Sequence, residues 1–145
     1  MRTPSMSLRA HLFACAMALM SGGAWAGHDS GGGAPADAVT LELITTNLAS
    51  EPGQDGRLIQ VGIQLKLNDP KDGETVKAYM PKIRSEILLT LCGHTATSLS
   101  TGDSRTALVE ELKDTVNSAL GGQKDKKGNI EGPVTNILFT YFLIP

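Results

Sequence analysis

The chain ends in a run of residues that is apolar on both faces of an extended backbone. Residues 137–144 read Ile-Leu-Phe-Thr-Tyr-Phe-Leu-Ile, and aromatic and β-branched side chains of this kind favour strands. On strict alternation, Leu138, Thr140, Phe142 and Ile144 lie on one face, and the other four residues lie on the opposite face. Both faces are mostly apolar. We therefore predict a strand that lies inside a sheet or has helices packed against it.

Two further segments have the pattern of strands. In residues 58–67, apolar side chains including Ile59, Val61, Ile63 and Leu65 alternate with more polar ones, which predicts one buried face and one solvated face. Residues 39–43 alternate in the same way over a shorter stretch. Residues 51–56 are rich in turn-forming types and predict a hairpin loop, and Asn-Asp-Pro at 68–70 ends the longer strand.

Two helices are predicted between these strands and the last one. The first has an apolar stripe that recurs every three or four residues, at Val76, Met80, Ile83, Ile87 and Leu91. Pro81 has no N–H to donate, so we expect a kink or a restart there. Gly93 is expected to form a left-handed C-terminal cap. On the outer side, Lys82 and Glu86 are spaced as i, i+4 partners.

The second helix is predicted over residues 104–120. Its inward residues are expected to be Leu108, Leu112, Val116 and either Ala119 or Leu120. Thr101, Asp103 or Ser104 can cap its start, and Gly121-Gly122 ends it. Residues 123–129 form a charged turn, interpreted as a solvated loop. The order ββααβ predicts an α+β domain in which two helices pack on a small sheet.

The N-terminal 26 residues have the three parts of a secretory signal peptide. Arg2 and Arg9 precede an apolar run at 12–20, and Ala-Trp-Ala at 24–26 fits a cleavage site, so the mature chain is predicted to start at Gly27. Two alternatives are an uncleaved signal that anchors the chain in the membrane and a buried N-terminal helix. Residues 27–38 are small and polar and predict a flexible linker, which leaves residues 39–145 as the domain.

The charge of the chain argues against two kinds of partner, and its cysteine content argues against an internal disulfide. The chain has 13 basic and 15 acidic side chains, and removal of the signal with its two arginines leaves 11 and 15, a net charge of −4. An acidic chain without a basic stripe argues against nucleic acid or anionic lipid as the partner. The same cleavage removes Cys15 and leaves Cys92 alone, so no internal disulfide is expected.

The sequence gives little sign of catalytic or metal chemistry. Cys92 and His94 lie two residues apart, but no further cysteine or histidine accompanies them at zinc-ligand spacing. The residues around Gly102 lack the spacing of a phosphate-binding loop, and no Gly-x-Ser-x-Gly nucleophile motif is present. The adjacent Glu110 and Glu111 point in different directions on a helix. We therefore expect a protein that is not an enzyme and needs no cofactor or metal.

Four motifs in order resemble the flagellar basal-body-associated FliL family. They are the strand at 61–67 with Asp69-Pro70, the Pro-x-Ile-Arg helix start at 81–84, Leu-Val-Glu-Glu-Leu at 108–112, and Leu-Phe-Thr-Tyr-Phe at 138–142. Each motif alone is common helix or strand chemistry. The four together, in the right order and spacing over residues 58–144, are what carries the resemblance.

The resemblance implies a periplasmic domain of the stomatin/prohibitin type, without cofactor or enzymatic activity. It also implies self-assembly into rings around flagellar stator units and binding to stator or basal-body proteins, in support of motility. Arg84, with its helix neighbours Lys82 and Glu86, is the candidate protein interface. Family members have a transmembrane helix where this chain has a signal-like segment. The alternative is therefore a soluble periplasmic binding or assembly module of the same fold without a motor role.

Overall fold

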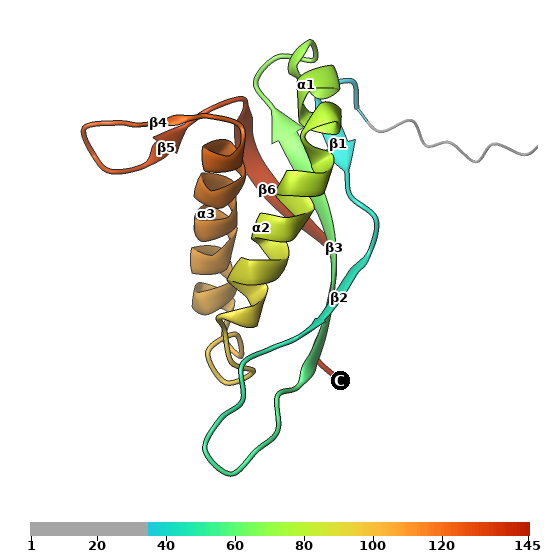
Figure 1. Cartoon of the computed structure of the whole chain (residues 1–145), viewed down its shortest axis with the longest axis vertical. Helices are drawn as coiled ribbons and strands as arrows, with labels where there is room; N and C mark the ends of the chain where they lie inside the picture. Colours follow the sequence, from blue (N-terminus) through green and yellow to red (C-terminus); the bar gives the residue numbers. More distant parts are fainter. Residues whose placement is uncertain (1–34) are drawn as a thin grey trace, which may run out of the picture. The chain divides into compact units, whose positions relative to one another are not determined.

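A four-stranded antiparallel sheet forms the base of the domain in the computed structural model, which describes residues 35–145 (Figure 1). Its strands are β1 (Ala38–Thr40), β2 (Ile44–Asn47), β3 (Leu58–Leu67) and β6 (Val134–Leu143). β3 is central, with β6 on one side and with β1 and β2, one after the other, on the opposite side. The predicted signal peptide, and residues 27–34 of the predicted linker, lie outside the described residues.

The predicted strand at 58–67 is confirmed as β3, with Ile59, Val61, Ile63 and Leu65 fully buried. The predicted hairpin loop joins β2 to β3, although sequence reasoning missed β2 and placed a single strand at 39–43. The last strand is confirmed as β6. Of its two predicted settings, the interior position is wrong, whereas packing against a helix is confirmed, because α3 contacts β6. β6 pairs with β3 alone and is an edge strand of the sheet among the described residues.

A β-bulge corrects the predicted faces of β6. Ile63 pairs with Phe139 and Gly62 pairs with Tyr141, so Thr140 is left without a partner on β3. The extra residue changes the alternation, so that both Phe139 and Phe142 pack against the core while Tyr141 is exposed. Gly62 makes room for the bulge, because a Cβ there would lie 2.5 Å from the Thr140 Oγ1.

The first predicted helix divides into two, α1 (Asp72–Ala78) and α2 (Met80–Cys92), separated by Tyr79. The expected restart at Pro81 is confirmed, because proline lies in the first turn of α2, where its missing N–H has no helical partner to lose. The predicted stripe also holds, with Met80 partly buried and Val76, Ile83, Ile87 and Leu91 fully buried.

The predicted left-handed cap at Gly93 is wrong. Gly93 has φ −79° and ψ −15°, which is right-handed helical backbone. The chain continues beyond it in tight turns, with the Gly93 N–H bonded to the Thr90 carbonyl and the His94 N–H bonded to the Leu91 carbonyl. Because these turns continue in the right-handed helical region, the chain leaves α2 without the left-handed conformation that was predicted for Gly93.

The second predicted helix is α3 (Gly102–Ala119), and its cap is Thr101. The Thr101 hydroxyl accepts from the Ser104 N–H at 3.2 Å, and the Ser104 hydroxyl accepts from the Thr101 N–H at 3.3 Å. Beyond α3, Gly121 has φ +85°, a conformation that glycine adopts without strain. The predicted solvated turn lies within a small hairpin of β4 (Gln123–Lys124) and β5 (Ile130–Glu131).

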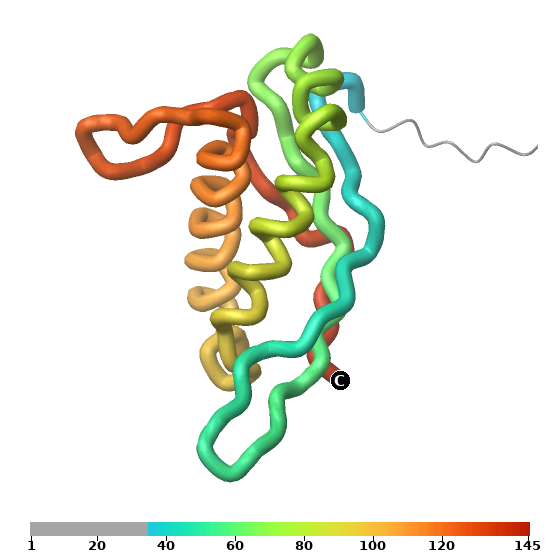
Figure 2. The backbone as a smooth tube through the Cα atoms, viewed as in Figure 1, coloured from blue at the N-terminus to red at the C-terminus, as the bar shows by residue number. Residues whose placement is uncertain are grey.

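Helices α2 and α3 lie side by side across one face of the sheet, with the β4–β5 hairpin beyond the end of α3 (Figures 1 and 2). The core lies between these two layers, which confirms an α+β domain. The order along residues 35–145 is βββαααβββ, so the expected ββααβ order omitted β2, the division of the first helix and the small hairpin. None of the helices in this part of the chain is long and apolar enough to cross a membrane.

Candidate functional site

The structure places the three predicted interface residues on two different sides of α2. Lys82 and Glu86 are four residues apart, about one helical turn, and both line a groove between α2 and α3. Arg84 points elsewhere, toward the segment between β1 and β2. Its Nη1 lies 3.4 Å from the Glu42 carbonyl oxygen and 3.6 Å from the Glu42 carboxylate. The three residues therefore do not form one continuous interface.

Lys82 does not form the expected i, i+4 pair with Glu86. Its ammonium donates instead to the Ala119 carbonyl at the end of α3, at 3.0 Å. The C-terminal end of a helix carries a partial negative charge, so the ammonium group of Lys82 is stabilised at this position. Lys82 thus connects α2 to α3, while no ion pair of Glu86 occurs among residues 35–145.

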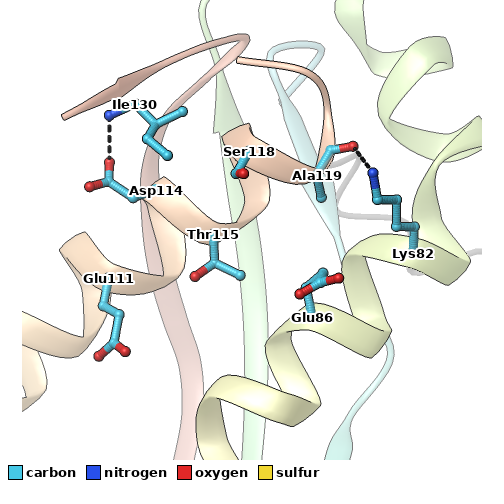
Figure 3. Close-up of a pocket in the computed structure, with 8 residues that line it drawn as sticks. All are labelled: Lys82, Glu86, Glu111, Asp114, Thr115, Ser118, Ala119 and Ile130. Carbon is cyan, nitrogen blue, oxygen red and sulfur yellow. Dashed lines mark hydrogen bonds between the residues drawn. The ribbon is translucent and has the colours of Figure 1, made fainter. Parts of the chain in front are cut away.

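The groove has a volume of about 610 Å³ and is open to solvent. One wall is α2, the other is the outward side of α3, and the β4–β5 hairpin closes one end (Figure 3). Six of its eight lining residues are polar or charged; the lining consists of Lys82, Glu86, Glu111, Asp114, Thr115, Ser118, Ala119 and Ile130.

The charge of the groove is negative. Glu86, Glu111 and Asp114 contribute three carboxylates, and Lys82 contributes the single ammonium, which the Ala119 carbonyl already holds. Asp114 accepts the Ile130 N–H at 3.2 Å and so fixes the hairpin against α3. Glu86 has no such partner in the described part of the chain. The charge of the groove is therefore complementary to basic side chains and hydrogen-bond donors.

Glu111 and Asp114 are the site residues that sequence reasoning missed. From the sequence, Glu111 is considered only together with Glu110, as adjacent residues that point in different directions on a helix. The available signal was spacing, since residues 111, 114, 115 and 118 recur at three- and four-residue intervals and form one face of α3. What the spacing does not reveal is that this face borders the Lys82 and Glu86 side of α2.

Cys92 and His94 do not act together. The Cys92 sulfur lies 3.3 Å from the Thr46 hydroxyl on β2, whereas His94 Nε2 lies 2.9 Å from Glu111 Oε2 on α3. In residues 35–145, no three histidine, cysteine, aspartate or glutamate side chains are grouped so that they could hold a metal ion. His94 instead ties the connection after α2 to the far end of the acidic groove.

Comparison with known proteins gives consistent matches to one family. Residues 38–144 match the family model of the flagellar basal body-associated protein FliL. The chain is 30% identical over 104 residues to the flagellar protein FliL of Escherichia coli K12 and, equally, to that of Shigella flexneri. Each alignment covers 72% of this chain and 62% of the relative, so the matched region spans less than two thirds of the relatives' length.

Proposed function

Because the chain belongs to the FliL family of flagellar basal body-associated proteins, we propose that it is a non-enzymatic accessory of the flagellar motor. In this proposal it acts in the periplasm, self-associates, and binds stator units or other basal-body proteins to support motility. The observation that carries the proposal is the family match over residues 38–144, nearly the whole described domain. A stomatin/prohibitin-like fold is part of the same proposal, supported by the α+β architecture.

We propose the α2–α3 groove as the surface that contacts a motor partner. Its support is geometric and electrostatic: Glu86 and Glu111 line opposite walls, and the groove carries three carboxylates against one ammonium. Charge complementarity favours a partner segment with lysine or arginine side chains. Arg84, on the other side of α2, is proposed as a separate contact, and its position beside Glu42 makes it part of a second surface.

A deletion strain tests the motor role. We expect the strain to swim more slowly in viscous medium and to have fewer stator units at each motor, with the gene restoring both. Unchanged swimming and stator occupancy would support the second candidate, a free periplasmic binding or assembly module of the same fold. That candidate is favoured by the signal-like segment at 1–26, whose apolar run at 12–20 is shorter than the roughly 20 apolar residues of a membrane-spanning helix.

Complementation with charge reversals tests the groove. Glu86→Lys should fail to restore swimming under load, because it removes the free carboxylate and repels a basic partner. Glu74→Lys is the matched control, since Glu74 is an exposed glutamate on α1 away from the groove. If Glu86→Lys protein is folded, present at normal levels and fully active, the groove is not the partner surface. Pull-down of stator proteins with Arg84→Glu gives the corresponding test of the second surface.

A further inference from the structure

The β4–β5 hairpin projects from the end of α3 and carries lysines at its tip. In Figures 1 and 2 the tip lies away from both α2 and α3. Residues 124–129, which we call the lysine tip, include Lys124, Lys126 and Lys127, and all three side chains are exposed. None of the three forms an ion pair within residues 35–145. The tip therefore presents three ammonium groups to its surroundings.

One carboxylate holds the lysine tip in shape. Asp125 Oδ1 accepts the Lys127 N–H at 2.7 Å and the Asn129 N–H at 2.9 Å, and the Asp125 N–H donates to the Asn129 carbonyl at 2.8 Å. Gly128 has φ +93°, which allows the tight reversal without strain. Asp125 is therefore bonded within the turn, while the lysines are left free. A turn that is already ordered loses little conformational entropy when it binds.

The lysine tip and the α2–α3 groove carry opposite charges. The tip has three ammonium groups and one carboxylate, a net formal charge of +2. The groove has three carboxylates and one ammonium group, a net formal charge of −2. On the α2 wall, Glu86 has no ion pair among the described residues, so its charge is available to an incoming cation. The tip is thus a basic segment of the kind that the charge of the groove favours.

The lysine tip is held away from the groove of its own chain. Ile130, at the base of the hairpin, donates its N–H to the Asp114 carboxylate and accepts the Asn117 amide at its carbonyl, both at 3.2 Å (Figure 3). These two bonds fix the hairpin against α3, with the tip directed outward. Moving the tip into its own groove would break both of them. A tip that fills the groove must therefore come from another molecule.

We propose that the lysine tip of one copy of this chain docks in the α2–α3 groove of a second copy. The proposal rests on the proposed function, in which the chain self-associates and the groove takes a basic segment, and it names that segment. Two grooves repel each other, as do two tips, whereas a tip and a groove attract, so the contact is head to tail. A free tip remains at one end and a free groove at the other, so further copies can add.

The first test is the association of the purified chain. Sedimentation velocity over a range of concentrations should show species larger than a dimer, because a head-to-tail contact does not end at two copies. These species should dissociate as sodium chloride is added, because salt screens exposed charges. Association that does not change with salt would contradict a contact between lysines and carboxylates.

Neutralising the lysine tip is the second test. Lys126→Gln combined with Lys127→Gln should abolish association, because it leaves the tip without net charge. Lys66→Gln combined with Lys71→Gln is the matched control, since both lysines are exposed outside the hairpin and their loss changes the total charge equally. A folded tip variant that associates like the wild type would overturn the inference. If that variant also failed to restore swimming, the tip would contact a different molecule.

The groove variant completes the test. Glu86→Lys should also abolish association, and Glu74→Lys on α1 is again the control. If circular dichroism shows that Glu86→Lys is unfolded, Glu86→Gln replaces it. Mixing the folded groove variant with the tip variant should give a dimer of one copy of each and nothing larger, since only one intact tip and one intact groove remain between them. A mixture that stays monomeric would show that the tip and the groove do not meet.

This contact and the proposed function can fail separately. A wild-type chain that stays monomeric at every concentration would overturn both the contact and the proposed self-association. Association that survives in the tip and groove variants would overturn the contact alone. The motor role is decided by the deletion strain, whichever surface the copies use.

Discussion

At the scale of single residues, Asn117 is the least expected part of the core. It is 1% exposed on the inward side of α3, among apolar neighbours, and its amide makes three hydrogen bonds to backbone groups. Two of them close the start of β6 at Val134, and the third holds Ile130 in β5. The position of Asn117 in the sequence, directly after Val116, does not indicate that its side chain bonds to Ile130 and Val134. Asn117 therefore connects α3, the small hairpin and the last strand.

Replacing Asn117 with alanine should destabilise the domain, because it leaves the Val134 N–H and carbonyl buried without partners. Each unpaired buried group costs on the order of 1–3 kcal/mol. The free energy of unfolding from urea melts, measured with circular dichroism, checks the expected loss. Ser118→Ala, one residue along on the exposed side of α3, is the control and should change the unfolding free energy by less than about 0.5 kcal/mol. Equal stabilities would mean that Asn117 is not a structural residue.

Glu51 makes a contact between two loops that we expect to be sensitive to acid. Hydrogen bonds from the side chains of Thr95 and then Thr97 lower the pKa of Glu51, and the Thr97 hydroxyl lies 3.0 Å from its carboxylate. A carboxylate whose folded-state pKa is lowered stabilises the fold above its unfolded pKa, and this stabilisation is lost as pH falls through the folded-state value. We expect the contact between the β2–β3 loop and the α2–α3 connection to weaken as the pH falls below the ordinary pKa of a glutamate.

The measurement is a comparison of Glu51→Gln with the wild type in denaturant melts at neutral and acidic pH. The variant should be less stable at neutral pH, and the difference should shrink as the pH falls. Asp55→Asn is the control, since Asp55 is an exposed carboxylate of the same loop, whereas Thr95 and Thr97 bond to Glu51. A stability difference that is constant with pH would show that the Glu51 carboxylate does not stabilise the loops.

At the scale of elements, the pairing of β3 with β6 depends on one glycine. A Cβ at Gly62 would lie 2.5 Å from the Thr140 Oγ1 and 3.1 Å from the Tyr141 Cβ. Gly62 is therefore the position on β3 that accommodates the bulge. Because the bulge reverses which side chains face inward, Gly62 also decides that Phe142 packs on the core, where Arg105 lies 4.9 Å from its ring centre.

Gly62→Ala should destabilise the domain by about 1–3 kcal/mol, as overpacking does in other cores. Removing the Thr140 hydroxyl with Thr140→Ala should recover part of that loss, so that the double variant is more stable than the two single effects added together. Gly102→Ala is the control, since a Cβ at Gly102 meets nothing within 4 Å. If Gly62→Ala and Gly102→Ala unfold at the same denaturant concentration, β3 and β6 tolerate a side chain at the bulge.

At the scale of the whole molecule, the predicted signal peptide implies that the chain is cleaved after residue 26. If residues 1–26 are a signal peptide, the protein purified from the envelope should have Gly27 as its first residue, and mass spectrometry of the intact chain checks this directly. An intact N-terminus would instead support the membrane-anchored alternative, in which residues 1–26 stay attached. Either form leaves residues 39–145 as the proposed domain, which agrees with the family match over 38–144.

Most of the fold follows from local patterns in the sequence. The burial of Ile59, Ile83 and Leu112 was predicted because residues of one type at a fixed period must share one face of a strand or helix. The candidate site could be predicted only in part from the sequence. Spacing placed Lys82 and Glu86 on one face of α2, but it grouped them with Arg84 and did not bring in Glu111 or Asp114, which come from a helix some 25 residues later in the sequence.

The sequence by itself determined the α+β class, the inward faces of the helices, the restart at Pro81 and the family, because each depends on neighbouring residues and their periods. Only the tertiary structure decided that β6 is an edge strand, that a bulge reverses its faces, and that Lys82 binds α3 rather than Glu86. The physical reason is that these outcomes depend on which segments become neighbours in space. Strand order, the fit of Thr140 over Gly62 and the groove between α2 and α3 come from long-range packing, which no local period encodes.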